Sequence, residues 1–288
     1  MIDIITVVFR DELDFLKIQA RSLDLYADPT DIDTIYIVVN DADDVVDLID
    51  TNWWGQHKNI QVVPYSKWNY INRVNGWENQ QICKLLGASE AVSEWSMCLD
   101  AKTWLVQELE LDKLFDKTGK PRVGFMNVTP VFHSSRDFVE DHYQIKMNKV
   151  LGPAGVPFMF HTKTVQDMIT GFTNFIDFFQ TNVRYPYFVT EFHLYDGYVL
   201  SAHGTYEALY NKEQQYICFN IADFDVKNFE IHYKNILLDS PNALTASIHR
   251  RAYPLLSKEQ LIKWQQFLVQ RKLNIKAILG DKQLWHSI

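Results

Sequence analysis

The sequence predicts an α/β fold with a mixed sheet that is parallel in its first half and flanked by helices. Short segments rich in β-branched residues alternate along the chain with longer segments whose apolar residues recur at helical spacing. This alternation is typical of βαβ units, which form parallel sheets. A length of 288 residues fits one large α/β domain, so we expect a single domain over residues 1–288.

The first half of the chain shows this alternation most regularly. We predict two helices, over residues 11–27 and 76–92, because their apolar residues repeat every three or four positions. Gln81 and Lys84 lie on the polar face of the second helix and are free to reach a ligand. Four buried strands are predicted, at Ile2–Phe9, Thr34–Asp41, Ile60–Tyr65 and Trp95–Asp100.

The second half is less regular. A helix is predicted after Thr190, which is a suitable N-cap, with Glu191 in the first turn and Tyr195 one turn later. The final helix, over residues 257–272, begins with a capping-box pattern. The remaining predictions are a helix over residues 137–152, a connector rich in Pro and Gly over 152–160, and strands over 123–128, 214–221 and 242–250.

Composition and charge exclude several classes of protein. The net charge of -8 argues against a general nucleic-acid binder, which needs a basic surface to neutralise phosphates. No apolar run reaches the roughly 18 residues of a membrane-spanning helix, so we expect no membrane insertion. The three cysteines are odd in number and far apart, and the N-terminus lacks a signal-peptide pattern. A cytoplasmic protein is therefore predicted.

The segment "SMCLDAKTWL" carries the most informative polar residues. Its apolar strand ends on Asp100, and Lys102 follows two residues later. Ligands of open α/β sheets bind outside the carboxyl ends of the strands. Arg10, at the end of the first strand, is expected to face the same crevice. An acid at this position can also simply cap a turn, so the sequence alone allows a structural role as well.

The longer segment "QICKLLGASEAVSEWSMCLDAKTWL" resembles the core of GT-A glycosyltransferases, in which a helix with a Lys-Leu pair precedes a strand ending in a D-x-D motif. "PFMFHTKTVQDMI", "TEFHLYDGYV" and "SIHRR" follow in the order found in small single-domain bacterial and viral members. The resemblance implies a GT-A-like (Rossmann-like) domain. Residues 1–105 would form its nucleotide-binding half and residues 106–288 its acceptor-binding half.

The resemblance also implies a function. It predicts a hexosyltransferase-type enzyme that uses a nucleotide-sugar donor, a UDP- or GDP-sugar, and a carbohydrate or glycoconjugate acceptor. Asp100 occupies the first acidic position of the motif and Lys102 the second. The family's motif holds manganese or magnesium, and the resemblance places His249 beside Asp100 as a second metal ligand. A protonated lysine cannot bind a cation, but its ammonium group can neutralise a diphosphate. Both a metal-independent site and an unusual metal site remain open.

The candidate site residues form three groups. The catalytic candidates are Glu191, Asp100 and Lys102. Glu191 is the base that removes the acceptor proton if the enzyme inverts the anomeric centre, and it positions the acceptor if the enzyme retains it. Glu191 and Tyr195 are the predicted acceptor contacts. The predicted donor contacts are Arg10, Gln81, Lys84, Asp100, Lys102, His249 and Arg250, with Arg251 as a further source of positive charge.

Two other functions fit parts of the sequence. A nucleotidyltransferase can share a related sheet, but it usually has a Gly-rich phosphate loop after its first strand, and "VVFRDELDF" contains no glycine. A catalytically weak carbohydrate- or nucleotide-binding protein of the same fold is the second alternative, and the lysine in place of an acid at position 102 is the best argument for it.

Overall fold

The central sheet of the computed structural model is mixed, as predicted. The structure describes residues 1–68, 76–152 and 156–280. Strands β1 (Ile2–Val8), β2 (Ile32–Val39), β3 (Ile60–Val63) and β4 (Trp95–Asp100) run parallel to one another, whereas β8 (Phe158–His161) is antiparallel to β4. The strand order is β3-β2-β1-β4-β8. The carboxyl ends of the four parallel strands therefore lie at one edge.

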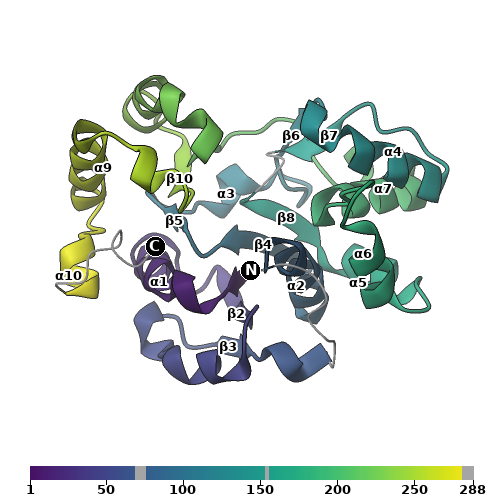
Figure 1. Ribbon diagram of the computed structural model, residues 1–288, viewed down its shortest axis with the longest axis horizontal. Helices are drawn as coiled ribbons and strands as arrows, with labels where there is room; N and C mark the ends of the chain where they lie inside the picture. The colour runs from purple at the N-terminus through teal and green to yellow at the C-terminus, as the bar shows by residue number, and fades with distance from the viewer. Residues whose placement is uncertain (69–75, 153–155, 281–288) are drawn as a thin grey trace.

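Helices α1 (Leu13–Tyr26) and α2 (Gly76–Glu90) cover opposite faces of this sheet (Figure 1). Successive side chains of a strand point to opposite faces. Ile5 of β1 packs against Gly87 of α2, whereas the next residue, Thr6, donates a hydrogen bond to Gln19 of α1. Both faces of β1 are therefore buried, which explains why most of its residues are apolar.

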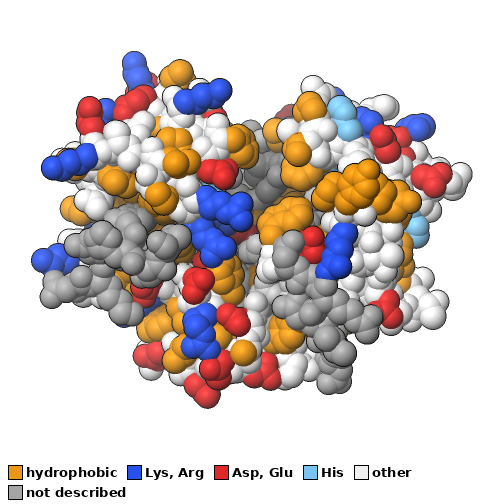
Figure 2. All heavy atoms as spheres, viewed as in Figure 1, with side chains coloured by type: hydrophobic (Ala, Val, Ile, Leu, Met, Phe, Trp, Pro, Cys, Tyr) orange, Lys and Arg blue, Asp and Glu red, His pale blue; other side chains and the backbone are white. Residues whose placement is uncertain are grey.

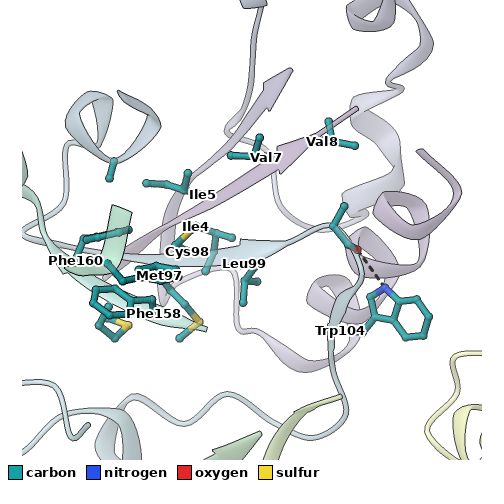
Figure 3. Packing of buried hydrophobic residues seen from close by; sticks show 14 of the residues in the cluster. Ile4, Ile5, Val7, Val8, Met97, Cys98, Leu99, Trp104, Phe158 and Phe160 are labelled. Carbon is teal, nitrogen blue, oxygen red and sulfur yellow. Dashed lines mark hydrogen bonds between the residues drawn. The ribbon is translucent and has the colours of Figure 1, made fainter. Parts of the chain in front are cut away.

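The core continues from the sheet into the turn that follows β4. The indole N–H of Trp104 contacts the carbonyl oxygens of Ala101, at 3.3 Å, and Phe15, at 3.2 Å. These contacts tie the turn after β4 to α1. Figure 3 shows the buried side chains of β1, β4 and β8 that form the core leading away from this turn: Ile4, Ile5, Val7, Val8, Met97, Cys98, Leu99, Phe158 and Phe160.

A second sheet brings a distant part of the chain to the same turn. It contains β5 (Thr103–Leu105), β10 (Ala243–Ile248) and β9 (Ile217–Ile221) in the order β5-β10-β9. Strand β10 is antiparallel to β5, with Ser247 opposite Thr103. The carboxyl end of β10 therefore lies beside the first residues after β4. A separate ribbon pairs β6 (Gly124–Met126) with β7 (Val150–Gly152).

Two of the helix starts predicted in the second half are confirmed, whereas the helix predicted from residue 137 begins earlier, at His133. The side chain of Thr190 accepts a hydrogen bond from the backbone N–H of His193 at the start of α7, and Ser257 and Gln260 form the predicted capping box of α9. None of the described helices is both long and apolar enough to cross a membrane. The helices after β4 are α3 (Leu111–Leu114), α4 (His133–Tyr143), α5 (Thr162–Thr170), α6 (Phe175–Asn182), α7 (Glu191–His203), α8 (Phe229–His232), α9 (Lys258–Gln270) and α10 (Ile275–Leu279).

The helix predicted over residues 137–152 is wrong in its second half. Helix α4 ends at Tyr143 because Gln144 adopts a left-handed conformation, with φ of 54°. The carboxylate of Glu140 then accepts the backbone N–H of Met147 and stabilises the reversal of the chain. Residues 150–152 form β7 because they find a strand partner in β6. The predicted connector over 152–160 lies partly outside the described residues.

The close contact between α2 and the sheet predicts the effect of a small substitution. A Cβ atom at Gly87 would lie 2.8 Å from Cγ2 of Val38 and 3.0 Å from Cγ2 of Ile5, so Gly87→Ala overpacks this contact. We expect a loss of about 1–3 kcal/mol in the free energy of unfolding, measured by urea denaturation. Gly76→Ala is the matched control in the same helix, since a Cβ there meets no described atom within 4 Å. Equal effects of the two substitutions would contradict the packing argument.

Candidate functional site

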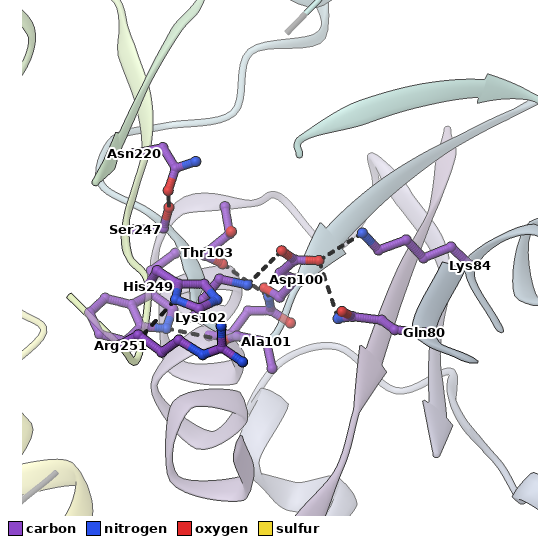
Figure 4. Close-up of polar contacts among 12 residues, drawn as sticks. Gln80, Lys84, Asp100, Ala101, Lys102, Thr103, Asn220, Ser247, His249 and Arg251 are labelled. Carbon is purple, nitrogen blue, oxygen red and sulfur yellow. Dashed lines mark hydrogen bonds and ion pairs between the residues drawn. The ribbon is translucent and has the colours of Figure 1, made fainter. Parts of the chain in front are cut away.

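Four charged side chains of alternating sign meet at the carboxyl end of β4. The Oδ2 atom of Asp100 lies 2.6 Å from Nζ of Lys102, and its Oδ1 atom lies 3.0 Å from Nζ of Lys84 on α2. The same ammonium group of Lys84 lies 3.0 Å from Oε1 of Glu191 on α7. We call Lys102, Asp100, Lys84 and Glu191 the charged row. Figure 4 shows Lys84 and Lys102 approaching Asp100 from different sides.

The charged row is mostly removed from solvent. Its side chains retain between 5% and 14% of their exposure. Burial by itself favours the neutral form of each group, but Lys102 and Lys84 together hold the pKa of Asp100 well below its usual range. Likewise, burial opposes the charge of Lys84, but Asp100 and Glu191 raise its pKa above its usual value. Asp100 and Lys84 therefore stay charged at neutral pH.

Two glutamines position Asp100. The side-chain N–H₂ group of Gln19 on α1 donates to the carbonyl oxygens of Asp100, at 2.7 Å, and Thr103, at 2.9 Å, and so fixes the turn that carries Lys102. Gln80 on α2 approaches Oδ1 of Asp100 at 3.5 Å. Sequence reasoning missed Gln19. Its signal was a polar residue on the apolar face of the first helix, between Leu16 and Ala20.

The late strand supplies a second group of nitrogen-containing side chains. His249 follows β10, and burial together with the positive charge of Lys102 lowers its pKa to about 4, so it is neutral at pH 7. Its Nδ1 atom accepts the backbone N–H of Arg251 at 3.3 Å. The guanidinium group of Arg250 lies over the ring of Phe9, 4.8 Å from its centroid, and 3.9 Å from Asp11. The ends of β1, β4 and β10 thus meet at one edge.

A further buried acid, Glu12, follows β1. Burial raises the pKa of Glu12, and the charge of Lys102 opposes that rise. Its Oε2 atom has no hydrogen-bond partner among the described residues. Sequence reasoning missed Glu12. Its signal was its position after the first strand, which corresponds to the position of Asp100 at the end of the fourth.

Three predicted site residues have other surroundings than expected. The prediction that Tyr195 contacts the acceptor is wrong, because its side chain has no exposed surface. Its hydroxyl accepts the N–H of His161 and contacts the hydroxyl of Tyr210. Gln81 is also buried, and its Oε1 atom accepts the backbone N–H of Glu191 at 3.3 Å. The guanidinium group of Arg10 pairs with Asp44 at 2.7 Å on the exposed rim.

Glu191 lies in the site, but its carboxylate is directed to Lys84. The residue is only 3% exposed. Its position follows from α7, in which all residues from 191 to 197 are buried. The face of the molecule shown in Figure 2 has a hollow between the region around β10 and the β6–β7 ribbon. Lys and Arg side chains lie at the border of this hollow. This ion pair allows Glu191 to fix the position of the ammonium group of Lys84.

The described residues do not fit the divalent metal that the GT-A resemblance implies. Such a metal needs several oxygen or nitrogen ligands free of other partners. Both carboxylate oxygens of Asp100 face ammonium groups, and Nδ1 of His249 already accepts a backbone N–H. No group of three or more His, Cys, Asp or Glu side chains within residues 1–68, 76–152 and 156–280 is arranged to hold a metal ion.

The fold is that of GT-A glycosyltransferases. The galactosyltransferase LgtC, whose structure contains donor and acceptor sugar analogs, is similar over 100% of both chains, with a TM-score of 0.51 and 13% identity. The glycosyltransferase GlyE of Streptococcus pneumoniae TIGR4 has a TM-score of 0.51 and 12% identity over 98% of this chain and 65% of GlyE. At these identities the likeness establishes the fold alone.

The family of the chain is also established. The chain belongs to the family described as "Family of unknown function (DUF6492)", whose model matches residues 4–223. This range includes most of β1 and the whole of α2, β4 and α7, and therefore all four residues of the charged row, but it ends before His249. No curated protein matches the chain.

The burial of Lys84 between two carboxylates predicts a large effect on stability. We expect Lys84→Met to lower the free energy of unfolding by about 3–5 kcal/mol, because it leaves Glu191 as a buried charge without its cation. Adding Glu191→Gln should recover part of this loss, and urea denaturation of the single and double variants measures the coupling.

The control for this cycle is an exposed ion pair. Lys67 lies 2.7 Å from Glu90, and both side chains are partly exposed. Lys67→Met should cost no more than about 1 kcal/mol. If Lys84→Met and Lys67→Met had the same effect, Lys84 would not be holding the two carboxylates.

Proposed function

We propose that the protein is a glycosyltransferase that moves a sugar from a nucleoside-diphosphate sugar to a carbohydrate or glycoconjugate acceptor. The observation that carries this proposal is the charged row at the carboxyl end of β4, the edge at which sheets of this type bind ligands. The GT-A fold supports it, since the similar structures are a galactosyltransferase and a glycosyltransferase.

The chemistry of the reaction matches what the charged row offers. The bond between the anomeric carbon and the β-phosphate oxygen breaks, and a bond from that carbon to the acceptor oxygen forms. The acceptor hydroxyl releases its proton, and the nucleoside diphosphate leaves with increased negative charge. Fixed cations in a site with little water stabilise such a leaving group best. Lys102, in the turn directly after β4, is the proposed contact for the diphosphate.

The donor is proposed to be a UDP- or GDP-hexose. Residues 1–105 would bind its nucleotide, with Arg10 at the rim beside the base or ribose. His249 and Arg250, at the end of β10, would approach the diphosphate from the side opposite α2. Residues 106–288 would form the acceptor half. This assignment extends the sequence-based prediction and is supported by the meeting of β1, β4 and β10 at one edge.

Glu191 is proposed to act as a positioning residue for Lys84 rather than as the base that an inverting reaction would require. Its carboxylate is ion-paired with Lys84, and Gln81 accepts its backbone N–H. In this role Glu191 keeps the ammonium group of Lys84 directed to Asp100.

The function is tested with a panel of UDP-, GDP-, CMP- and dTDP-sugars, with the release of free nucleotide as the measurement. We expect one donor to be consumed, and Asp100→Asn to lower kcat/KM about 100-fold or more, because both lysines lose the carboxylate that orients them. Asp167→Asn, on α5 at the opposite edge of the sheet, is the control and should keep full activity.

Two outcomes would contradict this assignment in different ways. A nucleotide that binds while no donor is consumed would favour the non-catalytic binding protein of the same fold. Absence of binding to every nucleotide and nucleotide sugar at millimolar concentration would exclude both.

The role of Glu191 is tested by separating KM from kcat. If Glu191 positions Lys84, Glu191→Gln should raise KM for the donor several-fold and leave the pH dependence of kcat unchanged. If Glu191 is the base, the same variant should lower kcat by about 100-fold or more at saturating donor and remove the acidic limb of the pH profile. Glu94→Gln, an exposed acid beside His161 at the opposite edge, is the control.

A further inference from the structure

We propose that Lys84 and Lys102 replace the divalent metal of a GT-A site, so that this protein binds the diphosphate of its donor without a metal ion. The inference rests on the proposed function and adds to it the way in which the diphosphate is held. It starts from the misfit between the described side chains and a metal, since both oxygens of Asp100 already face ammonium groups.

The net charge of the row equals that of a metal-containing site. The D-x-D site that the sequence resembles combines two carboxylates with one divalent cation, which gives a net charge of zero. The charged row combines the carboxylates of Asp100 and Glu191 with the ammonium groups of Lys84 and Lys102, which gives the same net charge. The row therefore reproduces the balance of a metal site with cations that are covalently part of the chain.

The two lysines differ in how many of their N–H donors are used within the protein. An ammonium group has three N–H donors. Lys84 lies 3.0 Å from both Asp100 and Glu191 and is packed over the ring of Phe192, so its donors are directed into the protein. Lys102 makes one hydrogen bond within the described part of the chain, to Asp100. Lys102 can therefore offer its other donors to phosphate oxygens, while Lys84 holds Asp100 in place.

The two ammonium groups beside Asp100 oppose the binding of a metal ion. A divalent ion at Asp100 would have to displace both ammonium groups or lie against them, and like charges repel strongly where solvent is largely excluded. The second acidic position of the motif holds Lys102 itself. His249 offers no compensation at Nδ1, which accepts the N–H of Arg251. A diphosphate, in contrast, brings the negative charge that the lysines attract.

Calorimetry on the full chain tests the inference directly. UDP, GDP, CDP and dTDP are titrated separately, once with EDTA and once with MnCl₂. We expect the nucleotide that binds to do so in EDTA, with Kd changed less than about threefold by Mn²⁺. Lys102→Met should weaken this binding about tenfold or more, which corresponds to about 1.4 kcal/mol. Lys163→Met, an exposed lysine on α5 at the opposite edge, should bind as the unaltered protein does.

A second variant tests the exchange of lysine for metal. Lys102→Asp restores the second acid of the motif and removes one of the two cations. We expect this variant to lose binding in EDTA and to recover it, at least in part, in Mn²⁺. Circular dichroism checks that each variant is folded, and the comparison of the unaltered protein with and without Mn²⁺ decides the question even if a variant does not fold.

The outcomes separate this inference from the proposed function. Binding of a nucleoside diphosphate only in Mn²⁺ would overturn the lysine replacement and leave glycosyl transfer standing. Binding in EDTA that is unaffected by Lys102→Met would overturn the role of Lys102. A protein that binds none of the four nucleotides under either condition would overturn the proposed function as well.

Discussion

The carboxylate of Asp100 between two ammonium groups is the interaction on which the site depends. It joins three parts of the fold, because Asp100 ends β4, Lys102 lies in the next turn and Lys84 projects from α2. Lys84 then extends the interaction to α7 through Glu191. A buried ion pair is weak evidence for stability, since well-packed apolar residues are often as good or better. The row is therefore better explained by what it can bind than by what it stabilises.

The sequence predicted the first half of the fold well because each element there has a strong local signal. Strands β1 and β2 are rich in β-branched residues, and α2 has apolar residues at helical spacing. The end of β4 at Asp100 could be predicted because the mainly apolar segment stops there at a charged residue. The error over residues 137–152 occurred where local pattern and tertiary pairing disagree, since β7 exists only because β6 lies beside it.

The site was only partly predictable, because the contact between Lys84 and Glu191 joins residues 107 positions apart. Nothing in either helix alone says that Lys84 faces Glu191, since this depends on how α2 and α7 pack. The same limit explains the error for Tyr195. Helix α7 is buried on nearly all sides, so spacing along the helix does not tell which side chains reach a ligand. The resemblance to GT-A glycosyltransferases predicted that His249 lies near Asp100. The antiparallel pairing of β10 with β5 accounts for this position.

The charged row also implies how the free protein is prepared for its ligand. Lys84 is held by two carboxylates and Lys102 by one, so the two cations are already oriented before any diphosphate arrives. Preorganised charges lose little free energy to rearrangement when negative charge develops beside them. A bound metal offers the same advantage only while it is bound, and its occupancy varies with the metal concentration. Two lysines, one in the turn after β4 and one on α2, would keep their positive charges in the site at any metal concentration, at the cost of burying four ionised groups.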